Sequence, residues 1–265
     1  MFEHHTENYC YSSSGIHHPS STVRKRVFYL FFRFVQSLRI DIDIQHVPPI
    51  LQAIQDLLTF DVEFPEDFDP SEFPGRSDQE ILANFLKEPT MFDAQLYMFE
   101  AAGALVSTLW SLPEYQPDAL RSVAGPLLSR LSTCLQAPTV AAGGRLGEEE
   151  LKNVLAVHHC IQALGSIPKG FPEYPSPVPP DYIPPPIAEF RQMADAILVS
   201  LDFMGQFRIV REAVSTILCA LHTLLMPRLF AGSLCVWAHH ICSGSIYYRV
   251  HSSVDELSRR SFRGL

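Results

Sequence analysis

Apolar residues recur along this chain at the three-to-four-residue spacing of an α-helix, while the two-residue alternation of a half-buried strand is nearly absent. The first such segment spans residues 22–39 and carries a stripe made of Val23, Val27, Leu30, Phe31, Phe34 and Leu38. A second set widens this stripe, namely Phe28, Phe32 and Val35. A helix that is apolar over so much of its circumference is expected to contact neighbours on more than one side. The pattern therefore predicts an all-α fold.

Further helices follow from the same periodicity and from local start and stop signals. A short helix is expected after Pro48 and Pro49, and another at Ser77, where Glu80 completes a capping box. Longer helices are predicted over residues 93–112, 117–137, 148–167, 187–204 and 206–225. On the helix over 93–112 the predicted packing face is Phe92, Leu96, Phe99, Gly103, Val106 and Trp110, and the predicted wet face is Asp93, Glu100 and Ser107.

The helices group into antiparallel pairs whose first members start near residues 22, 93, 148 and 206. No pair has enough partner surface to bury its wide apolar face alone, so stacking into an α-solenoid of HEAT-like pairs is predicted. The expected organisation is an N-terminal tail over 1–21, helical repeats over 22–225 and a C-terminal tail over 226–265. Within the repeats we expect an acidic loop over 60–77 and a proline-rich, extended connector over 168–186.

The net charge of −9 is local, because the stretch 60–80 holds eight acids and one arginine and so accounts for about −7 of it. The rest of the chain is close to neutral, and the overall acidity does not exclude an RNA partner. Six cysteines at irregular spacing favour a reduced, intracellular protein without a disulfide framework.

Basic residues without acidic neighbours mark the first predicted helix. The candidate contacts to an RNA backbone are Arg24, Lys25, Arg26, Arg33 and Arg39, with a weaker second patch at Arg208 and Arg211. Each cation that neutralises a phosphate releases counterions and adds salt-sensitive affinity. The alternative is a solvated surface or ion pairs between repeats. The aromatic residues of the first helix follow its packing stripe, so recognition of RNA shape and backbone is expected, and stacking on single-stranded bases is not.

No catalytic, cofactor or metal site is predicted. Adjacent helical residues such as His158, His159 and Cys160 point about 100° apart and cannot all face one ion, so core filling is the expected role. The tail residues Cys235, His239, His240 and Cys242 do not have a common zinc spacing. The apolar stretch 217–237 approaches the length of a membrane span, but Pro227 and Arg228 lie at its middle, and no span is expected.

Several segments resemble, in order and spacing, the exportin-T family of karyopherins, and the fungal members most closely. They are HPSSTVRKRVFYLFFRFVQSLR (18–39), VPPILQAIQDLL (47–58), DAQLYMFEAAGALVSTL (93–109), VLAVHHCIQALGSIPKGFP (154–172) and FRIVREAV (207–214). The similarity runs from His18 to Val214 and corresponds to an internal slice of a typical family member.

The resemblance implies a non-enzymatic superhelix that wraps transfer RNA together with Ran-GTP, contacts nuclear pore proteins and shuttles between nucleus and cytoplasm. In the family, Ran-GTP is held mainly by N-terminal repeats to which nothing here corresponds. We therefore expect the isolated chain neither to bind Ran-GTP nor to carry RNA with useful affinity. Two other interpretations stay open: a helical-repeat scaffold for protein partners, and a membrane-attached helical protein. The aperiodic tail from Arg228 onward also suggests that the gene model reads into an intron or ends prematurely.

Overall fold

The structure is a computed structural model that describes residues 16–62, 64, 77–87, 89–137, 146–173, 175 and 179–225. Across these residues the chain forms helices and no strand. The α-helices are α2 (Ser21–Leu38), α3 (Val47–Ala53), α4 (Asp78–Phe85), α5 (Met91–Ser107), α6 (Gln116–Gln136), α7 (Glu148–Ser166), α8 (Ile187–Met204) and α9 (Arg208–Leu225). Short 3-10 helices join them, namely η1 (Ile44–His46), η2 (Gln55–Leu58), η4 (Thr108–Ser111) and η5 (Ile167–Gly170).

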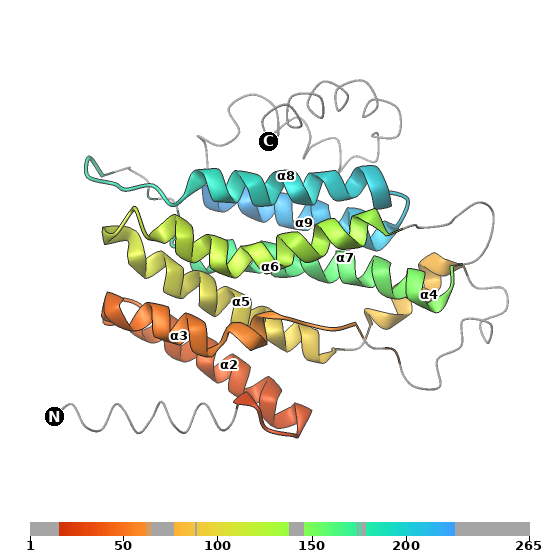
Figure 1. The fold of residues 1–265 in the computed structure, drawn as a ribbon, viewed down its shortest axis with the longest axis horizontal. Helices are drawn as coiled ribbons and strands as arrows, with labels where there is room; N and C mark the ends of the chain where they lie inside the picture. Colours follow the sequence, from red (N-terminus) through yellow and green to blue (C-terminus); the bar gives the residue numbers. More distant parts are fainter. Residues whose placement is uncertain are drawn as a thin grey trace.

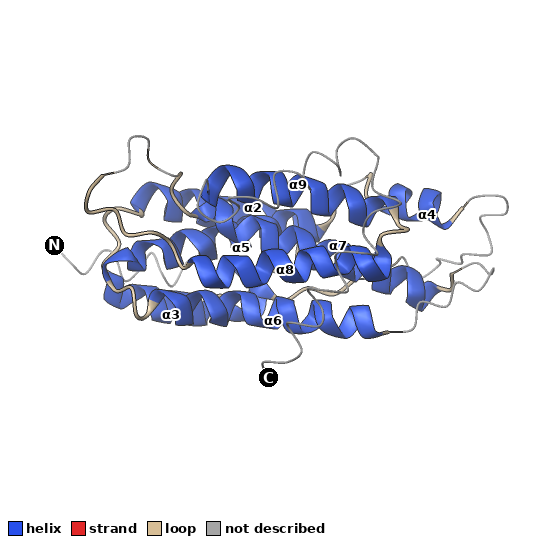
Figure 2. Ribbon diagram, turned by 90° about the horizontal axis from the view of Figure 1, so that it is seen from above, coloured by secondary structure: helices blue, strands red, loops and turns tan. Residues whose placement is uncertain are grey.

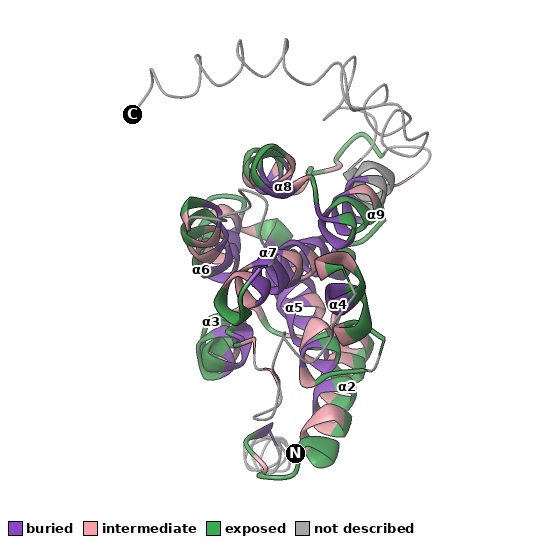
Figure 3. Ribbon diagram, turned by 90° about the vertical axis from the view of Figure 1, so that its right-hand side faces the viewer, coloured by how far each residue is buried: buried purple, intermediate pink, exposed green. Residues whose placement is uncertain are grey.

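The long helices lie side by side in two layers (Figures 1 and 2). In one layer α2 packs on α5, α5 on α7 and α7 on α9, and in the other α6 packs on α8, with α3 beyond α6 (Figure 3). Contacts of α6 with α7 and of α8 with α9 join the layers. The pairs α2–α3, α5–α6 and α7–α8 therefore stack in the order of the chain, and α9 occupies the place of the first helix of a fourth pair. The prediction of an all-α solenoid is confirmed.

Two glycines allow the closest approach between successive pairs. A Cβ atom on Gly103 of α5 would overlap the carbonyl oxygen of Ile167 in η5, and a Cβ atom on Gly170 would overlap the backbone nitrogen of Ala104. The turn that ends α7 is therefore seated directly on the backbone of α5. Phe99, which lies one turn before Gly103, is fully buried beside this contact. The predicted packing roles of Phe99 and Gly103 are thus confirmed.

The packing face predicted for α2 is correct in part but too wide. Phe28 and Val35 are buried, and Val27, Phe31 and Phe32 pack against the core. Leu30 is 62% exposed and Phe34 45% exposed, so their predicted packing role is wrong. Among the described helices α2 has one principal neighbour, α5, so a single face of the wide apolar surface is covered. The expectation of contacts on more than one side is not met among the described residues.

Two assignments on the helix after residue 93 are also wrong. Ser107 is buried, because its hydroxyl donates a hydrogen bond of 2.7 Å to the carbonyl oxygen of Ala104 and so needs no water. Trp110 is 60% exposed. It lies in η4, where the helix tightens to three residues per turn and the side chains leave the register of α5.

The capping box predicted at Ser77 is present at the start of α4. The Ser77 backbone N–H donates to the Glu80 carboxylate at 2.7 Å, and the Glu80 backbone N–H donates to the Ser77 hydroxyl at 3.4 Å. The helix that it starts packs against α7 and α9. Its Gln79 amide donates to the carbonyl oxygen of Gln206 at 2.8 Å and accepts from the Arg208 backbone N–H at 2.8 Å. α4 thus holds the turn between α8 and α9.

Several predictions fall on residues outside the described ranges. They concern most of the N-terminal tail, most of the acidic loop, the tail from residue 226, and the four cysteine and histidine residues between 235 and 242. The domain limits proposed from the sequence therefore stay predictions.

Candidate nucleic-acid interface

The seven cations predicted to contact RNA form two separate groups. Four lie on α2, Arg39 follows directly at its end, and two lie on α9. α2 and α9 are the outermost described helices of one layer, with α5 and α7 between them (Figure 1). The fold therefore does not bring the seven residues into one site.

Three of the five cations on or next to α2 are half-buried, and two of them donate hydrogen bonds to other elements of the fold. The Lys25 ammonium donates to the carbonyl oxygen of Pro89 at 3.0 Å, just before α5. The Arg39 guanidinium donates to the carbonyl oxygen of Gly170 in η5 at 3.4 Å. Arg24 has a buried Nε atom that meets no hydrogen-bond partner among the described residues. Because these side chains are half-buried, and two of them already donate to backbone carbonyls, they are poorly placed for phosphates.

Arg26 and Arg33 point away from the protein. Both are exposed, and they lie seven residues apart on one face of α2. No hydrogen bond or ion pair engages either guanidinium within the described part of the chain, and α2 itself contains no acidic residue. Of the predicted contacts, these two are the best placed for an anionic ligand.

The α9 patch is engaged in local structure. The Arg208 guanidinium forms an ion pair of 2.6 Å with Glu212, one turn along the same helix. The Arg211 guanidinium donates to the carbonyl oxygens of Gly205 at 2.7 Å and Gln206 at 3.0 Å, and so satisfies acceptors at the end of α8. Both side chains would have to give up these partners to bind a phosphate.

An exposed pair of tyrosines beside Arg26 and Arg33 was not predicted from the sequence. Tyr29 of α2 is 44% exposed and Tyr97 of α5 is 37% exposed, and their ring centroids are 5.3 Å apart in an edge-on arrangement. Tyr97 also stacks on Phe32 at 5.4 Å. The assignment of all α2 aromatics to the packing stripe is therefore wrong for Tyr29. A helical wheel centred on Phe28 would have placed Tyr29 about 100° from the core and next to the two arginines.

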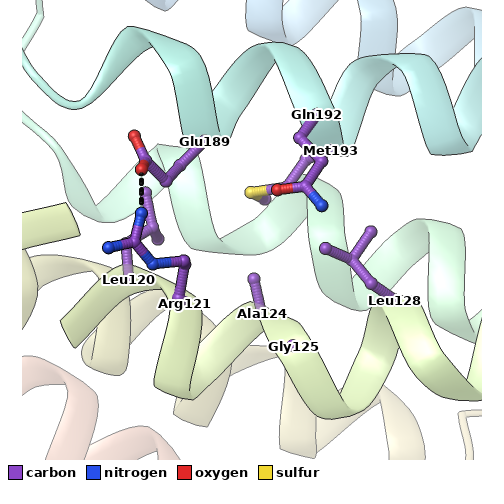
Figure 4. A pocket seen from close by; sticks show the side chains of 8 residues that line it. All are labelled: Leu120, Arg121, Ala124, Gly125, Leu128, Glu189, Gln192 and Met193. Atoms are coloured by element: carbon purple, nitrogen blue, oxygen red, sulfur yellow. Dashed lines mark hydrogen bonds and ion pairs between the residues drawn. The ribbon is translucent and has the colours of Figure 1, made fainter. Parts of the chain in front are cut away.

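A cavity of about 220 Å³ lies between α6 and α8 (Figure 4). Its wall is mainly apolar, and Gly125 leaves it open because no atom lies within 4 Å of the place where a Cβ would stand. At one end Arg121 forms an ion pair of 2.5 Å with Glu189 and a second with Asp118. The charged residues of the cavity are thus paired with each other. The cavity has room for an apolar group, and its lining contains neither a nucleophile nor an unpaired acid.

His159 and Cys160 of α7 belong to the core, and His158 is half-buried beside them. The His159 ring stacks on Phe92 with centroids 3.8 Å apart, and burial lowers its pKa to about 3. Burial also lowers the pKa of His158 to about 4 and raises the pKa of Cys160 to about 12. All three side chains are uncharged at neutral pH. Within the described ranges no three histidine, cysteine or acidic residues group closely enough to hold a metal ion.

Membrane crossing finds no support among the described helices, none of which combines the length and the apolar character that a span requires. Part of the apolar stretch 217–237 lies outside the described residues.

Comparison with known proteins gives one consistent result. A family model described as Exportin-T matches residues 4–235. Similar curated proteins include Exportin-T of Laccaria bicolor, 39% identical over 75% of this chain, and Exportin-T of Coprinopsis cinerea, 36% identical over 75% of it. Exportin-T of Aspergillus fumigatus is 30% identical over 86% of this chain. The matched regions cover 17%, 18% and 22% of these relatives, so the chain spans about a fifth of their length.

Proposed function

Because this chain belongs to the exportin-T family, we propose that it is a segment of a Ran-GTP-dependent nuclear export receptor for transfer RNA. The observation that carries this proposal is the family match over residues 4–235, and the stacked helix pairs of the fold agree with it. The receptor shuttles between nucleus and cytoplasm and meets nuclear pore proteins on the way. Its work is binding and transport, without catalysis.

The role proposed for this segment is to contact the RNA backbone and read its shape. Arg26 and Arg33 are the cations best placed for phosphates, because neither has a partner among the described residues and both face outward. Ran-GTP binds elsewhere in the receptor. The segment alone is then a weak RNA binder, since it contributes a small share of the contacts.

Salt-dependent binding to folded transfer RNA tests the proposal. Fluorescence anisotropy of labelled transfer RNA would be followed with the 265-residue chain between about 50 and 200 mM salt. We expect weak binding in which a plot of log K against log[salt] has a negative slope. Combining Arg26→Gln and Arg33→Gln should make that slope shallower by about 2, because each phosphate that is no longer neutralised reduces its magnitude by about 0.9. The matched control is Arg208→Gln, whose guanidinium is already paired with Glu212. A complete lack of binding at low salt, or a slope that the double variant leaves unchanged, would count against the proposal.

A pull-down with Ran-GTP tests the proposal that Ran-GTP binds to another part of the receptor. The isolated chain is expected to leave Ran-GTP in solution, with or without transfer RNA. Recovery of Ran-GTP on the immobilised chain would show that the Ran contact is not confined to other regions of the receptor.

A protein-binding scaffold is the second candidate, and the outer surface of α2 favours it. Val23 is 36% exposed, Leu30 62% and Phe34 45%, and they recur at helical spacing along one edge. An apolar edge of this kind is suited to a partner helix. Binding to a protein with retained affinity at high salt, and no binding to transfer RNA, would favour this candidate over the first.

A further inference from the structure

We propose that the outer face of α2 binds unpaired RNA, with a base stacked on Tyr29 and the flanking backbone held by Arg26 and Arg33. This inference deepens the proposed function and rests on it. The site is called here the Tyr29 face and consists of Arg26, Tyr29, Arg33 and the neighbouring Tyr97 of α5.

The spacing along α2 places the aromatic ring between the two charges. Tyr29 follows Arg26 by three residues and precedes Arg33 by four, so it neighbours both on the helix surface. The two arginines are separated by about 10 Å along the helix axis. A strand that runs along the helix can therefore have its backbone held on both sides of the base that meets Tyr29.

The neighbouring rings hold Tyr29 in place and leave part of it open. Tyr97 meets Tyr29 edge-on at 5.3 Å with an angle of 72° between the ring planes, and Phe32 backs Tyr97 at 5.4 Å. Tyr29 is 44% exposed despite this support. A ring fixed by its neighbours and open to solvent loses little freedom when a base stacks on it.

Charge favours an anionic chain as the ligand. α2 carries no acid, and no partner neutralises Arg26 or Arg33 among the described residues. Two acids of α5, Asp93 and Glu100, lie one helical turn from Tyr97 on either side, so they oppose an anion at the Tyr97 edge of the face. The Asp93 carboxylate accepts from the Thr90 backbone N–H at 2.6 Å, and burial raises the pKa of Glu100. A neutral apolar peptide would leave both guanidinium groups without a counter-charge.

An unpaired stretch fits this face better than a duplex does. Inside an A-form helix each base is already stacked on its neighbours and presents no face to a side chain. Single-stranded segments can splay their bases onto aromatic rings, and such stacking is largely independent of sequence. The expected ligand is thus an exposed, unpaired region of a folded RNA.

The test compares two RNA hairpins with the same duplex, one blunt and one with a short unpaired extension that contains 2-aminopurine. Binding to the 265-residue chain is measured by anisotropy at low salt, and stacking is followed by quenching of the 2-aminopurine fluorescence. We expect tighter binding of the extended hairpin by about fivefold or more, together with quenching.

Four variants test whether Tyr29 causes the preference for the extended hairpin and the quenching of 2-aminopurine. Tyr29→Leu is expected to abolish both the preference and the quenching, while Tyr29→Phe keeps the ring and retains both. Tyr115→Leu is the matched control, because Tyr115 is 60% exposed at the start of α6, away from the Tyr29 face. Tyr97→Leu, which removes the support, is expected to weaken the preference. Circular dichroism of each variant checks that the helices are intact.

The outcomes separate this inference from the proposed function. Equal binding of both hairpins, with Tyr29→Leu unchanged, would leave RNA binding in place and overturn the stacking site. Absence of binding to either hairpin and to folded transfer RNA would overturn both. Displacement of the extended hairpin by polyglutamate as effectively as by unlabelled extended RNA would show a general anion surface, or a site for an acidic protein, and would also overturn the inference.

Discussion

Gly170 lies directly against the backbone nitrogen of Ala104, so η5 and α5 meet through main-chain atoms and no side chain can be inserted between them. Gly103 makes the reciprocal contact with the carbonyl of Ile167. This junction joins the second and third helix pairs, and it explains why a glycine stands in the middle of α5, where it costs helix stability.

Alanine at either glycine is expected to destabilise the fold. Gly103→Ala and Gly170→Ala each force the two backbones apart, at a cost of about 1–3 kcal/mol in the free energy of unfolding. Gly125→Ala is the control, because its added methyl group enters open space. There the gain in helix propensity and the restriction imposed by the following Pro126 oppose each other, and a change within about 0.5 kcal/mol is expected. Urea unfolding of the three variants measures this, and an equal loss in all three would contradict it.

Stability is expected to fall as the pH drops below 6.5. The pKa of His158 is lowered to about 4 and that of His159 to about 3, whereas unfolded histidines titrate near 6.5. Below pH 6.5 the unfolded chain therefore binds protons that the folded chain excludes. The loss at pH 5 is about 2 kcal/mol for each histidine, since one pKa unit corresponds to about 1.4 kcal/mol.

Replacing both histidines isolates this effect from the titration of carboxylates. A His158→Gln, His159→Gln variant is expected to be less stable at pH 7.5, because the ring that stacks on Phe92 is removed, but its stability profile between pH 7.5 and 5 should be flatter. Urea unfolding across this pH range provides the comparison. Parallel profiles for the two proteins would show that the histidines are not the source.

The attachment of α4 depends on two polar residues. Ser77→Ala removes the side-chain cap at a cost of about 1 kcal/mol, and Gln79→Ala removes both hydrogen bonds to the turn between α8 and α9. We expect faster hydrogen exchange of the α4 amides in each variant, with the α5 amides unchanged. The matched control is Gln95→Ala, whose side-chain bonds are to the η2 region. Unchanged exchange in α4 would mean that apolar packing alone holds it.

The two ion pairs of Arg121 are expected to differ in what they contribute to stability. The Arg121 side chain is 55% exposed and the Asp118 side chain 71%, so solvent screens that pair, whereas the Glu189 side chain is only 13% exposed. Arg121→Gln leaves the Glu189 carboxylate without its partner and should therefore destabilise the fold more than Asp118→Asn does. Urea unfolding of the two variants measures this, and equal changes in both would contradict it.

Much of the fold could be predicted because its helices carry local signals. The capping box at Ser77 and the entry prolines of α3 and α6 fix where helices begin, and apolar spacing fixes their extent. The limits of the inward face of α2 could not be predicted, because apolar residues such as Leu30 and Phe34 also lie outside the part of the helix that α5 covers. Which face is buried depends on where α5 lies, and residues within α2 carry no record of that.

The site was predicted in part for a related reason. The seven cations could be identified from residue type alone. The sequence does not show, however, that Lys25, Arg39 and Arg211 donate hydrogen bonds to backbone carbonyls, because these contacts form only when the chain folds. Tyr29 was missed because exposure on a wide apolar helix depends on the neighbour. Its position beside Arg26 and Arg33 was available from the sequence all along.

The hold of α4 on the turn before α9 has a mechanical consequence. In a stack of helix pairs that contact only their neighbours, each junction can bend independently of the others. The hydrogen bond from Gln79 to Gln206 spans 127 residues and ties α4, which lies between the first and second helix pairs in the chain, to the turn before α9. Because this hydrogen bond connects segments that are far apart in the chain, the junctions between α4 and α9 cannot bend independently. This part of the stack is therefore stiffer than it would be without the hydrogen bond.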